Sequence, residues 1–510
     1  MLAAARSSTE DRRKCNLKSS WQVSSELVER QVISMTIQLW IILLYILVLF
    51  GISLYVKHRA NNSSGFLFAG RKLSTLLVAT NIAGTAIGAA STIGVAENAF
   101  QSGIAAGWYN GAWAAGAVLM ALVAAKKYRE LNCTTVPELF ERYYDKKGRI
   151  IAVLGMITLQ LVITSLQYLA GGAILSSLLP DIFSFQGGMI TSALVFFGTT
   201  ILGGLWSSGL SNILSVALIY IGVLISTSTI VARQGGIDQI AAALPAGIDW
   251  FGPLGGLGQA TIIGWFVVMM TQAITAQGPV QVACAAVNGK AAKRGFLWGA
   301  LLMFPIGFAC ALMGVAARAA HPDMNATMAL PYMIMSLDPF TSGLTLAALW
   351  AADVSTSCHI LLAAGTLFSQ DIYKRFINPA VSDQQYTRIN RYVILLLGIL
   401  TLWFAFNAAG IVKTMLIGLS LTTAFTLIFL FTMFAPGLCR KNSAFYTTLA
   451  GIVTLFLWQI FPSIQIFAHP IYMEWLVCLL TFFITAVLDH QPIRQIETTP
   501  EDGTPLLTKS

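Results

Sequence analysis

The chain has 510 residues, of which 56% are hydrophobic and only 10% are charged. A soluble domain carries about 25% charged residues, so this composition excludes an ordinary water-facing surface. The net charge of +9 has the right sign for nucleic-acid binding. The positions of the basic residues give a different explanation for it, and we expect no nucleic-acid partner.

Apolar runs follow one another from residue 36 to residue 488, and several reach the roughly 20 residues that a membrane-spanning helix needs. The runs are continuous and do not alternate, which favours helices over a closed barrel. We predict an all-α polytopic membrane protein, with the lipid bilayer as its surroundings. Thirteen transmembrane helices are expected near residues 38–56, 73–97, 103–125, 150–178, 187–202, 208–232, 258–280, 295–317, 342–369, 392–408, 411–435, 443–461 and 467–488.

The basic residues are divided unequally between the two sides of this arrangement. Of the 31 Lys and Arg, 22 fall on one side and 3 on the other, and the remaining 6 lie in the N-terminal tail, residues 1–37. By the positive-inside rule the richer side is cytoplasmic, so the N-terminus is outside and the C-terminus is inside. The basic tail would then face outward. One hypothesis is that translation begins at Met35, which the intact mass of the native protein would test.

The second predicted span, residues 80–94, is unusually small and polar, with the sequence TNIAGTAIGAASTIG. Gly84 and Gly88 form a GxxxG pair, which fits a tightly packed interior helix. The same composition fits a broken helix whose free carbonyls and hydroxyls line a site in the middle of the membrane. The sequence leaves both interpretations open.

The ninth predicted span places Ala352, Ser355 and Thr356 on one helical face, since they occur at i, i+3 and i+4. Two hydroxyls and a carbonyl are hard oxygen ligands and suit an alkali cation, by analogy with calcium. Alternatively, the hydroxyls bond back to their own helix. Asp353 is the most deeply placed acid of the central spans, where it would balance a cation, carry a proton or pair with a neighbouring helix. A packed, hydrogen-bonded role is expected for His359.

Soluble-enzyme motifs are absent: there is no P-loop, no HExxH and no strand-coupled GxGxxG. The seven cysteines are scattered and lack disulfide or zinc spacing. We therefore expect no enzyme and no cofactor, apart from a coupling ion.

Several segments of the sequence, including those just described, resemble the sodium/solute symporter family, which includes proline, pantothenate and sugar symporters. The resemblance runs from about Phe66 to Phe376. Four segments support it: FLFAGRKL at 66–73 with the polar stretch to Gly94, TTVPE at 134–138, residues 281–295, and AADVST at 351–356 followed by DIYK at 371–374.

The resemblance implies a LeuT-type core of two inverted five-helix repeats, which would be residues 73–232 and 258–435. Residues 38–56 and 443–488 would then be peripheral helices, and residues 489–510 a cytoplasmic tail.

The resemblance also implies which residues bind sodium and the solute. The sodium ligands would be the carbonyls of Gly84, Ile87 and Ala352 with the hydroxyls of Ser355 and Thr356. By position, the solute would meet Ser91, Trp108, Asn110, Trp265 and Gln277.

Three positions depart from the family pattern. The acid often found after Gly203-Gly204, which supports a second cation, corresponds to Asn212, and Val282 replaces an expected Arg. Asp353 stands where many relatives have an apolar residue. We therefore expect one sodium ion per solute, with Asp353 adjusting or partly replacing the second cation.

The expected function is sodium-coupled uptake of a small polar organic solute by alternating access, in a plasma membrane or a bacterial inner membrane. The solute would be an amino acid, carboxylate, vitamin or sugar. A proton-coupled or cation-independent permease on the same fold is the alternative. A transporter-like sensor is disfavoured, because such sensors usually add a large soluble domain.

Overall fold

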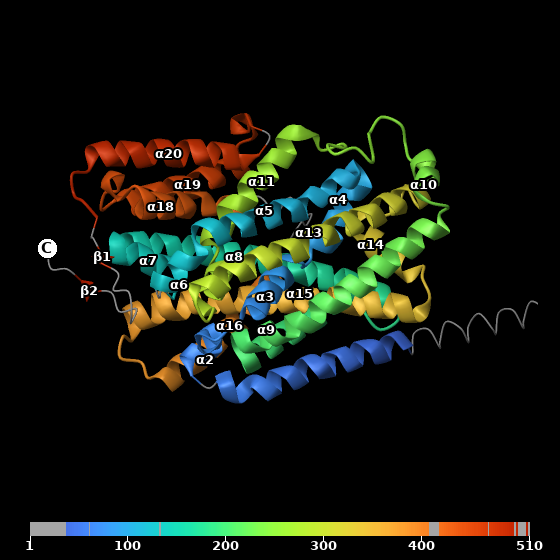
Figure 1. The fold of residues 1–510 in the computed structure, drawn as a ribbon, viewed down its shortest axis with the longest axis horizontal. Coiled ribbons are helices and arrows are strands. Elements are labelled where there is room, and N and C mark those ends of the chain that lie inside the picture. The colour runs from blue at the N-terminus through green and yellow to red at the C-terminus, as the bar shows by residue number, and fades with distance from the viewer. Residues whose placement is uncertain are drawn as a thin grey trace, which may run out of the picture.

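The computed structural model describes residues 37–60, 62–131, 134–406, 418–467 and 469–493, with two short strands beyond them. The predicted tail with Met35, and residues 411–417 of the eleventh predicted span, lie outside the described residues. The described chain is a bundle of helices that run mainly along the long axis of the molecule (Figure 1). The predicted helical fold class is confirmed.

The first half of the bundle contains the helices Ile37–Ala60, α2 (Ser63–Phe68), α3 (Thr75–Ala86), η3 (Ala90–Gly94), α4 (Val95–Ser102), α5 (Trp108–Val123), α6 (Ala125–Leu131), α7 (Val136–Tyr143), α8 (Lys146–Leu178), α9 (Phe185–Arg233) and α10 (Ile237–Ala243). The second half contains α11 (Gly258–Thr275), α12 (Gln277–Ala285), α13 (Gly289–Ala320), α14 (Ala329–Met335), α15 (Pro339–Leu367), η6 (Phe368–Ile377), α16 (Asp383–Ala405), α18 (Thr422–Phe434), α19 (Ser443–Ile460) and α20 (Pro470–Leu488). Strands β1 (Ile496–Glu497) and β2 (Leu506–Leu507) pair antiparallel.

Polar caps define where several long helices begin. The side chains of Asp145, Asn288 and Asp338 accept hydrogen bonds from backbone N–H groups in the first turns of α8, α13 and α15. Asp338 is followed by Pro339, whose fixed φ suits the first helical position. Because each of these caps fixes the residue at which a helix begins, the long apolar sequence is divided into separate helices.

Two helices of the core are broken. The segment after α3 bends by 58° between Ala86 and Ala90, and Ile87 lies there in a non-helical conformation (φ −85°, ψ 66°). Helices α11 and α12 meet at 47° around Ala276. Pro279 explains the second break, because it has no N–H to bond the Thr275 carbonyl. Each predicted repeat therefore begins with a broken helix, while the repeat boundaries themselves stay a prediction.

The long helix α9 reverses direction at Gly204, where φ is 53° and ψ is −142°. Ser192 and Ser226 lie on opposite sides of this point, yet both contact α15, at Trp350 and Thr345, less than two turns apart. A Cβ at Gly204 would lie 2.3 Å from the Phe66 carbonyl oxygen, so the turn requires glycine. The two halves correspond to the predicted spans 187–202 and 208–232.

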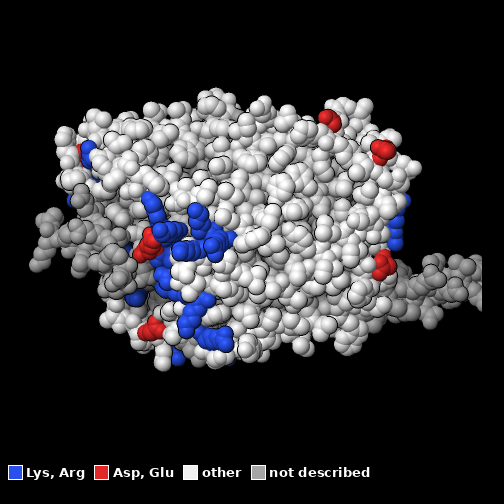
Figure 2. Space-filling model, in the orientation of Figure 1, with Lys and Arg blue, Asp and Glu red and all other residues white. Residues whose placement is uncertain are grey.

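Helix α15 lies at the centre of the bundle. Its most apolar window is 100% buried, against 28% for both the helix Ile37–Ala60 and α20 at the edges. Eight described helices are long and apolar enough to cross a membrane, or eleven if each bent pair is one span. Counting α9 as two spans and adding Gly418–Phe434 would reach the predicted thirteen, which stays a prediction. Figure 2 shows Lys and Arg gathered towards one end, beside a long surface almost free of charge.

Candidate ion and solute site

The break after α3 lies against the middle of α15. The Thr356 hydroxyl donates to the Gly84 carbonyl over 2.9 Å and approaches the Thr85 carbonyl at 3.3 Å. On α15 the Ser355 hydroxyl donates to the Ala352 carbonyl over 2.9 Å. The broken-helix interpretation of the second span is thus the one that agrees with the fold. The Thr356 and Ser355 hydroxyls and the Gly84 and Ala352 carbonyls therefore lie in a buried region where α3 meets the middle of α15.

A third helix, α8, holds the break in place. Gln167 accepts a hydrogen bond from the Ala89 N–H over 2.8 Å, which satisfies a backbone donor that the interrupted helix leaves free. A Cβ at Gly88 would lie 2.7 Å from both Gln167 Oε1 and Thr356 Oγ1, so only glycine fits between them. The sequence analysis did not single out Gln167, although a buried amide in an apolar span is itself a signal of function.

The predicted sodium ligands are therefore brought together in pairs. Gly84 contacts Thr356, and Ala352 contacts Ser355. Ile87 lies at the break itself, as the residue that ends α3. Their role as sodium ligands stays a prediction.

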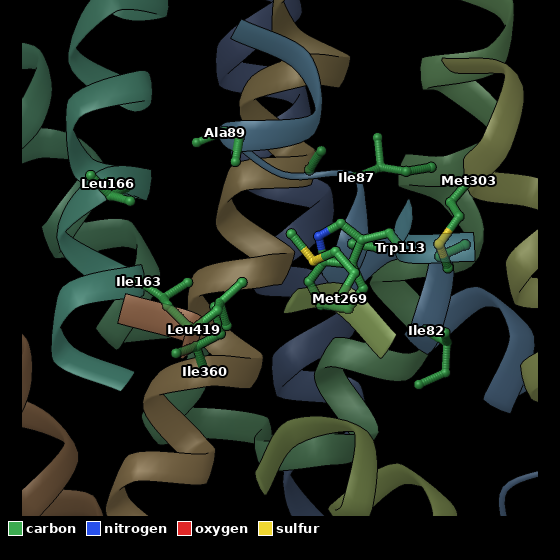
Figure 3. Packing of buried hydrophobic residues seen from close by; sticks show 14 of the residues in the cluster. Ile82, Ile87, Ala89, Trp113, Ile163, Leu166, Met269, Met303, Ile360 and Leu419 are labelled. Atoms are coloured by element: carbon green, nitrogen blue, oxygen red, sulfur yellow. The ribbon is translucent and has the colours of Figure 1, made fainter. Parts of the chain in front are cut away.

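A small enclosed cavity lies beside the break, between α3, α5, α11, α12 and α13. Its lining residues are Ile82, Thr85, Trp113, Ala117, Ala273, Pro279 and Phe296. The Thr85 hydroxyl is buried and has no hydrogen-bond partner in the described chain. Figure 3 shows Trp113 and Met269 close to the thin stretch of backbone at Ile87. Sequence reasoning missed Thr85 and Trp113, which face this space only because five helices pack around it.

The structure does not gather the predicted solute residues around one space. Ser91 is buried, and its hydroxyl bonds to the Ala86 carbonyl across the break. Trp108 donates to the Pro253 carbonyl in a loop at 2.9 Å. Asn110 donates to the Met303 carbonyl at 3.1 Å, and Trp265 packs edge-on against Tyr109.

Gln277 is held by other groups. Its Oε1 accepts from the Val136 N–H at 3.3 Å, and its Nε2 donates to the Thr134 carbonyl at 3.0 Å. Both ends of the amide are therefore used by the segment before α7. The assignment of solute contacts to these five positions stays a prediction, and only Ser91 lies at the break.

Of the two coupling candidates, Asn212 packs on Gly84, and Asp353 lies on α15 next to Ala352. Asp353 is fully buried, and neither carboxylate oxygen has a hydrogen-bond partner in the described chain. Asn212, on the second half of α9, packs so closely on Gly84 that a Cβ there would lie 2.3 Å from its Oδ1. Asn212 also bonds weakly with Asn81 and Ser208, at 3.4 Å each. The His359 ring packs on Gly278 at the start of α12.

A helical membrane bundle with two broken helices beside a hydroxyl-bearing central helix is the architecture of a secondary active transporter. The backbone carbonyls freed at the break and the nearby hydroxyls offer a place for a small cation. The enclosed cavity next to them, of about 10 Å³, has room for about one water molecule and not for an organic solute.

Comparison with known proteins agrees with this class. The sodium:solute symporter family model matches residues 66–451. The sodium/glucose cotransporter of Vibrio parahaemolyticus is 25% identical over 402 residues, 70% of this chain and 72% of that protein. The sodium/proline symporter of Haemophilus influenzae is 23% identical over 443 residues, 82% of this chain and 87% of that protein.

Solved structures show the same fold. A Na⁺-coupled sialic acid symporter, in a substrate-bound outward-open state, has a TM-score of 0.76 at 20% identity and covers 90% of this chain and 99% of its own. The nucleobase-cation symporter Mhp1, in a closed conformation, has a TM-score of 0.57 at 13% identity, covering 84% of this chain and 94% of its own. The LeuT-type fold is thereby confirmed.

The chain belongs to the sodium:solute symporter family. It is a membrane transporter that couples sodium to the symport of a small organic solute, and it is not an enzyme. The predicted function class is confirmed, whereas the site residues and the solute are proposals.

Proposed function

We propose that this symporter moves one sodium ion with each solute and binds that ion between α3 and α15. The proposed ligands are the carbonyl oxygens of Gly84, Ile87 and Ala352 and the hydroxyl oxygens of Ser355 and Thr356. The observation that supports this most directly is the 2.9 Å contact between Thr356 Oγ1 and the Gly84 carbonyl oxygen. It joins the two helices at hard oxygen atoms, which suit a desolvated alkali cation. We expect no further cofactor.

Sodium titration of purified variants tests this site. Ligand binding to the folded state raises the melting temperature with ligand concentration. In Thr356→Ala we expect the sodium concentration that gives half of this rise to increase about tenfold or more, equivalent to about 1.4 kcal/mol or more. Thr356→Ser keeps the hydroxyl and should behave like the wild type. Thr158, which is exposed and bonds to its own helix, offers Thr158→Ala as a control. An unchanged sodium titration in Thr356→Ala would refute the site.

We propose further that Asp353 balances the charge of the ion. Its carboxylate is buried one residue from Ala352 and accepts no hydrogen bond in the described chain. Asn212, which packs on Gly84, is neutral, which is the reason for proposing one ion and not two. Asp353→Asn should therefore change the sodium dependence of stabilisation and uptake. If both are unchanged, Asp353 has no part in coupling.

We propose that the solute is a small polar organic molecule, because similar proteins are named for solutes of this kind, glucose and proline. A thermal-shift screen of amino acids, carboxylates, vitamins and sugars, in sodium and in potassium, should find one class that stabilises more in sodium. Uptake of that solute into vesicles should follow an imposed sodium gradient. Uptake that follows a pH gradient alone would favour the proton-coupled alternative.

We also propose the plasma membrane as the location, with the C-terminus in the cytoplasm and the N-terminus outside. The supporting observation is the unequal division of Lys and Arg between the two sides of the chain.

A further inference from the structure

Glu474 is a buried acid in the peripheral helix α20, far along the chain from the sodium ligands proposed above. Its side chain is fully buried, and neither carboxylate oxygen accepts a hydrogen bond in the described part of the chain. The residue lies beyond the region that the family model matches, which ends at residue 451. An acid at this depth in an apolar helix is costly and is a default candidate for function.

Glu474 is enclosed by helices that contain no basic side chain. Helix α20 packs against α11, α18 and α19, as the upper edge of Figure 1 shows for the last three helices. None of these four helices contains Lys or Arg, and Glu474 is their only acid. The other titratable side chains on them are Tyr446, Tyr472 and Cys478, while His469 caps α20 and bonds to the Ile471 N–H. Among the described residues of these four helices, no cation therefore neutralises Glu474.

Hydroxyl groups surround the same space. The Thr423 side chain, on α18, faces Glu474. One turn along α20, the Cys478 thiol contacts the Thr447 carbonyl on α19 at 3.7 Å. The hydroxyls of Thr447 and Thr448 are buried and have no hydrogen-bond partner in the described chain, although threonines in helices usually bond back to their own carbonyls. Thr447 lies one turn before Gly451, where an added Cβ would lie 3.3 Å from the Cys478 sulfur, so both residues are on the side of α19 that faces α20. Thr448 is in line with Ala444 and Ile452, which face α8, and does not belong to this group.

We propose that Glu474 is the charged ligand of a second cation site, completed by the hydroxyl oxygens of Thr423 and Thr447. An ionised carboxylate without a partner costs several kcal/mol in an apolar interior, so it needs a proton or a bound metal cation. A monovalent cation leaves the site neutral, whereas a divalent cation would leave it charged. The class of ligand is therefore a monovalent cation, and sodium and a proton would compete for the same carboxylate.

The site is connected to the broken helix α11–α12. Trp475, next to Glu474, donates to the Thr271 hydroxyl at 3.2 Å. Thr426, on α18, donates to the Thr271 carbonyl at 2.6 Å and contacts the Thr275 hydroxyl at 2.7 Å. Thr275 is the last residue of α11 before the break at Ala276. We therefore expect cation exchange at Glu474 to act on the broken helix α11–α12, and not to depend on the ligands proposed on α3 and α15.

Infrared difference spectroscopy tests this site directly, because a protonated buried carboxyl group has its own carbonyl stretching band. Purified protein in lipid would be compared in potassium and in sodium, and then from about pH 5 to about pH 10, a range that covers the highest pKa values known for buried Glu. We expect the wild type to lose this band on addition of sodium, and Glu474→Gln, which is neutral and of the same size, to lack the change. Asp353→Asn and Thr356→Ala should keep it, which separates this site from the proposed coupling site.

A second variant keeps the carboxylate in place. Thr447→Val removes a hydroxyl without changing size, and it should raise by several-fold the sodium concentration at which half of the band is lost. A band that responds to pH but not to sodium would overturn the cation site, because the carboxyl group would then bind only a proton. If neither sodium nor pH changes any band that depends on Glu474, the proposal is wrong.

Discussion

Gly88 shows how one residue sets the geometry of the candidate site. It lies in the break after α3, and the oxygens of Gln167 and Thr356 approach it from α8 and α15. Three helices meet at this point because no side chain separates them. The close approach places the Thr356 hydroxyl next to the Gly84 carbonyl, on which the proposed ion site depends.

Gly88→Ala should therefore weaken sodium binding. The added methyl would lie 2.7 Å from two oxygens, and overpacking of this kind costs about 1–3 kcal/mol. We expect a lower melting temperature and a smaller sodium-dependent rise in it. Gly51→Ala is the matched control, because no atom lies within 4 Å of its added Cβ. Equal sodium titrations for the two variants would show that the contact at Gly88 is unimportant.

Glu141 gives a pH prediction at the same scale. It lies in α7 between Arg149, at 2.6 Å, and Arg375, at 3.0 Å. Burial alone would raise the pKa of this carboxyl, but hydrogen bonds from the two guanidinium groups outweigh it, so the pKa lies below its usual value. An acid with a lowered pKa stabilises the folded state above its unfolded pKa, and this stabilisation is lost as pH falls through the folded pKa.

The melting temperature of Glu141→Gln should therefore lie below that of the wild type at pH 7. The gap should narrow as pH falls below about 4.5, the ordinary value for this side chain. Glu130→Gln is the control, since Glu130 forms only an exposed pair with Lys126 and such pairs contribute about 0–1 kcal/mol. A gap that stays constant with pH would contradict an ionised, paired Glu141.

At the scale of elements, α12 is tied to the segment before α7 by Gln277. The amide pairs with the backbone of Thr134 and Val136. Between these two residues, the Thr135 hydroxyl donates to Asp371 of η6 over 2.9 Å. The segment is therefore held on one side by α12 and on the other by η6, which continues α15.

Gln277→Ala should loosen this segment. Hydrogen exchange measured by mass spectrometry should become faster for peptides containing Val136, whose N–H loses its acceptor. Gln385→Ala, at an exposed position in the first turn of α16, is a control that should leave those peptides unchanged. Equal exchange in the wild type and Gln277→Ala would show that the amide does not hold the segment, and would leave the predicted solute contact as its role.

At the scale of the whole molecule, the unequal distribution of charge is the basis of the orientation that we propose for the chain. Figure 2 shows the basic side chains near one end, where α2, α6 and α7 lie in Figure 1. Lys441 and Asp323, both exposed, lie on opposite predicted sides. The five cysteines among the described residues are buried and should react slowly.

A membrane-impermeant thiol reagent applied to intact cells checks this orientation. With Cys15 and Cys133 replaced by Ser, Asp323→Cys should react at once and Lys441→Cys only after the membrane is permeabilised. The reverse pattern would invert the proposed topology.

Composition, the charge division and the polar faces of residues 80–94 and 352–356 were readable from the sequence, because they depend on local order along the chain. They predicted the membrane class and the two polar segments of the proposed ion site, whereas the family was predicted from the resemblance of four sequence segments. The break at Ala276 was missed, although Pro279 signals it, since the apolar run continues through it. Only tertiary packing decided that Thr356 meets Gly84, that Gln167 caps the break, that Gln277 bonds the Thr134 segment, and that Glu474 lies among helices without a basic partner. These contacts join residues far apart in the chain, and local patterns do not determine which distant groups meet.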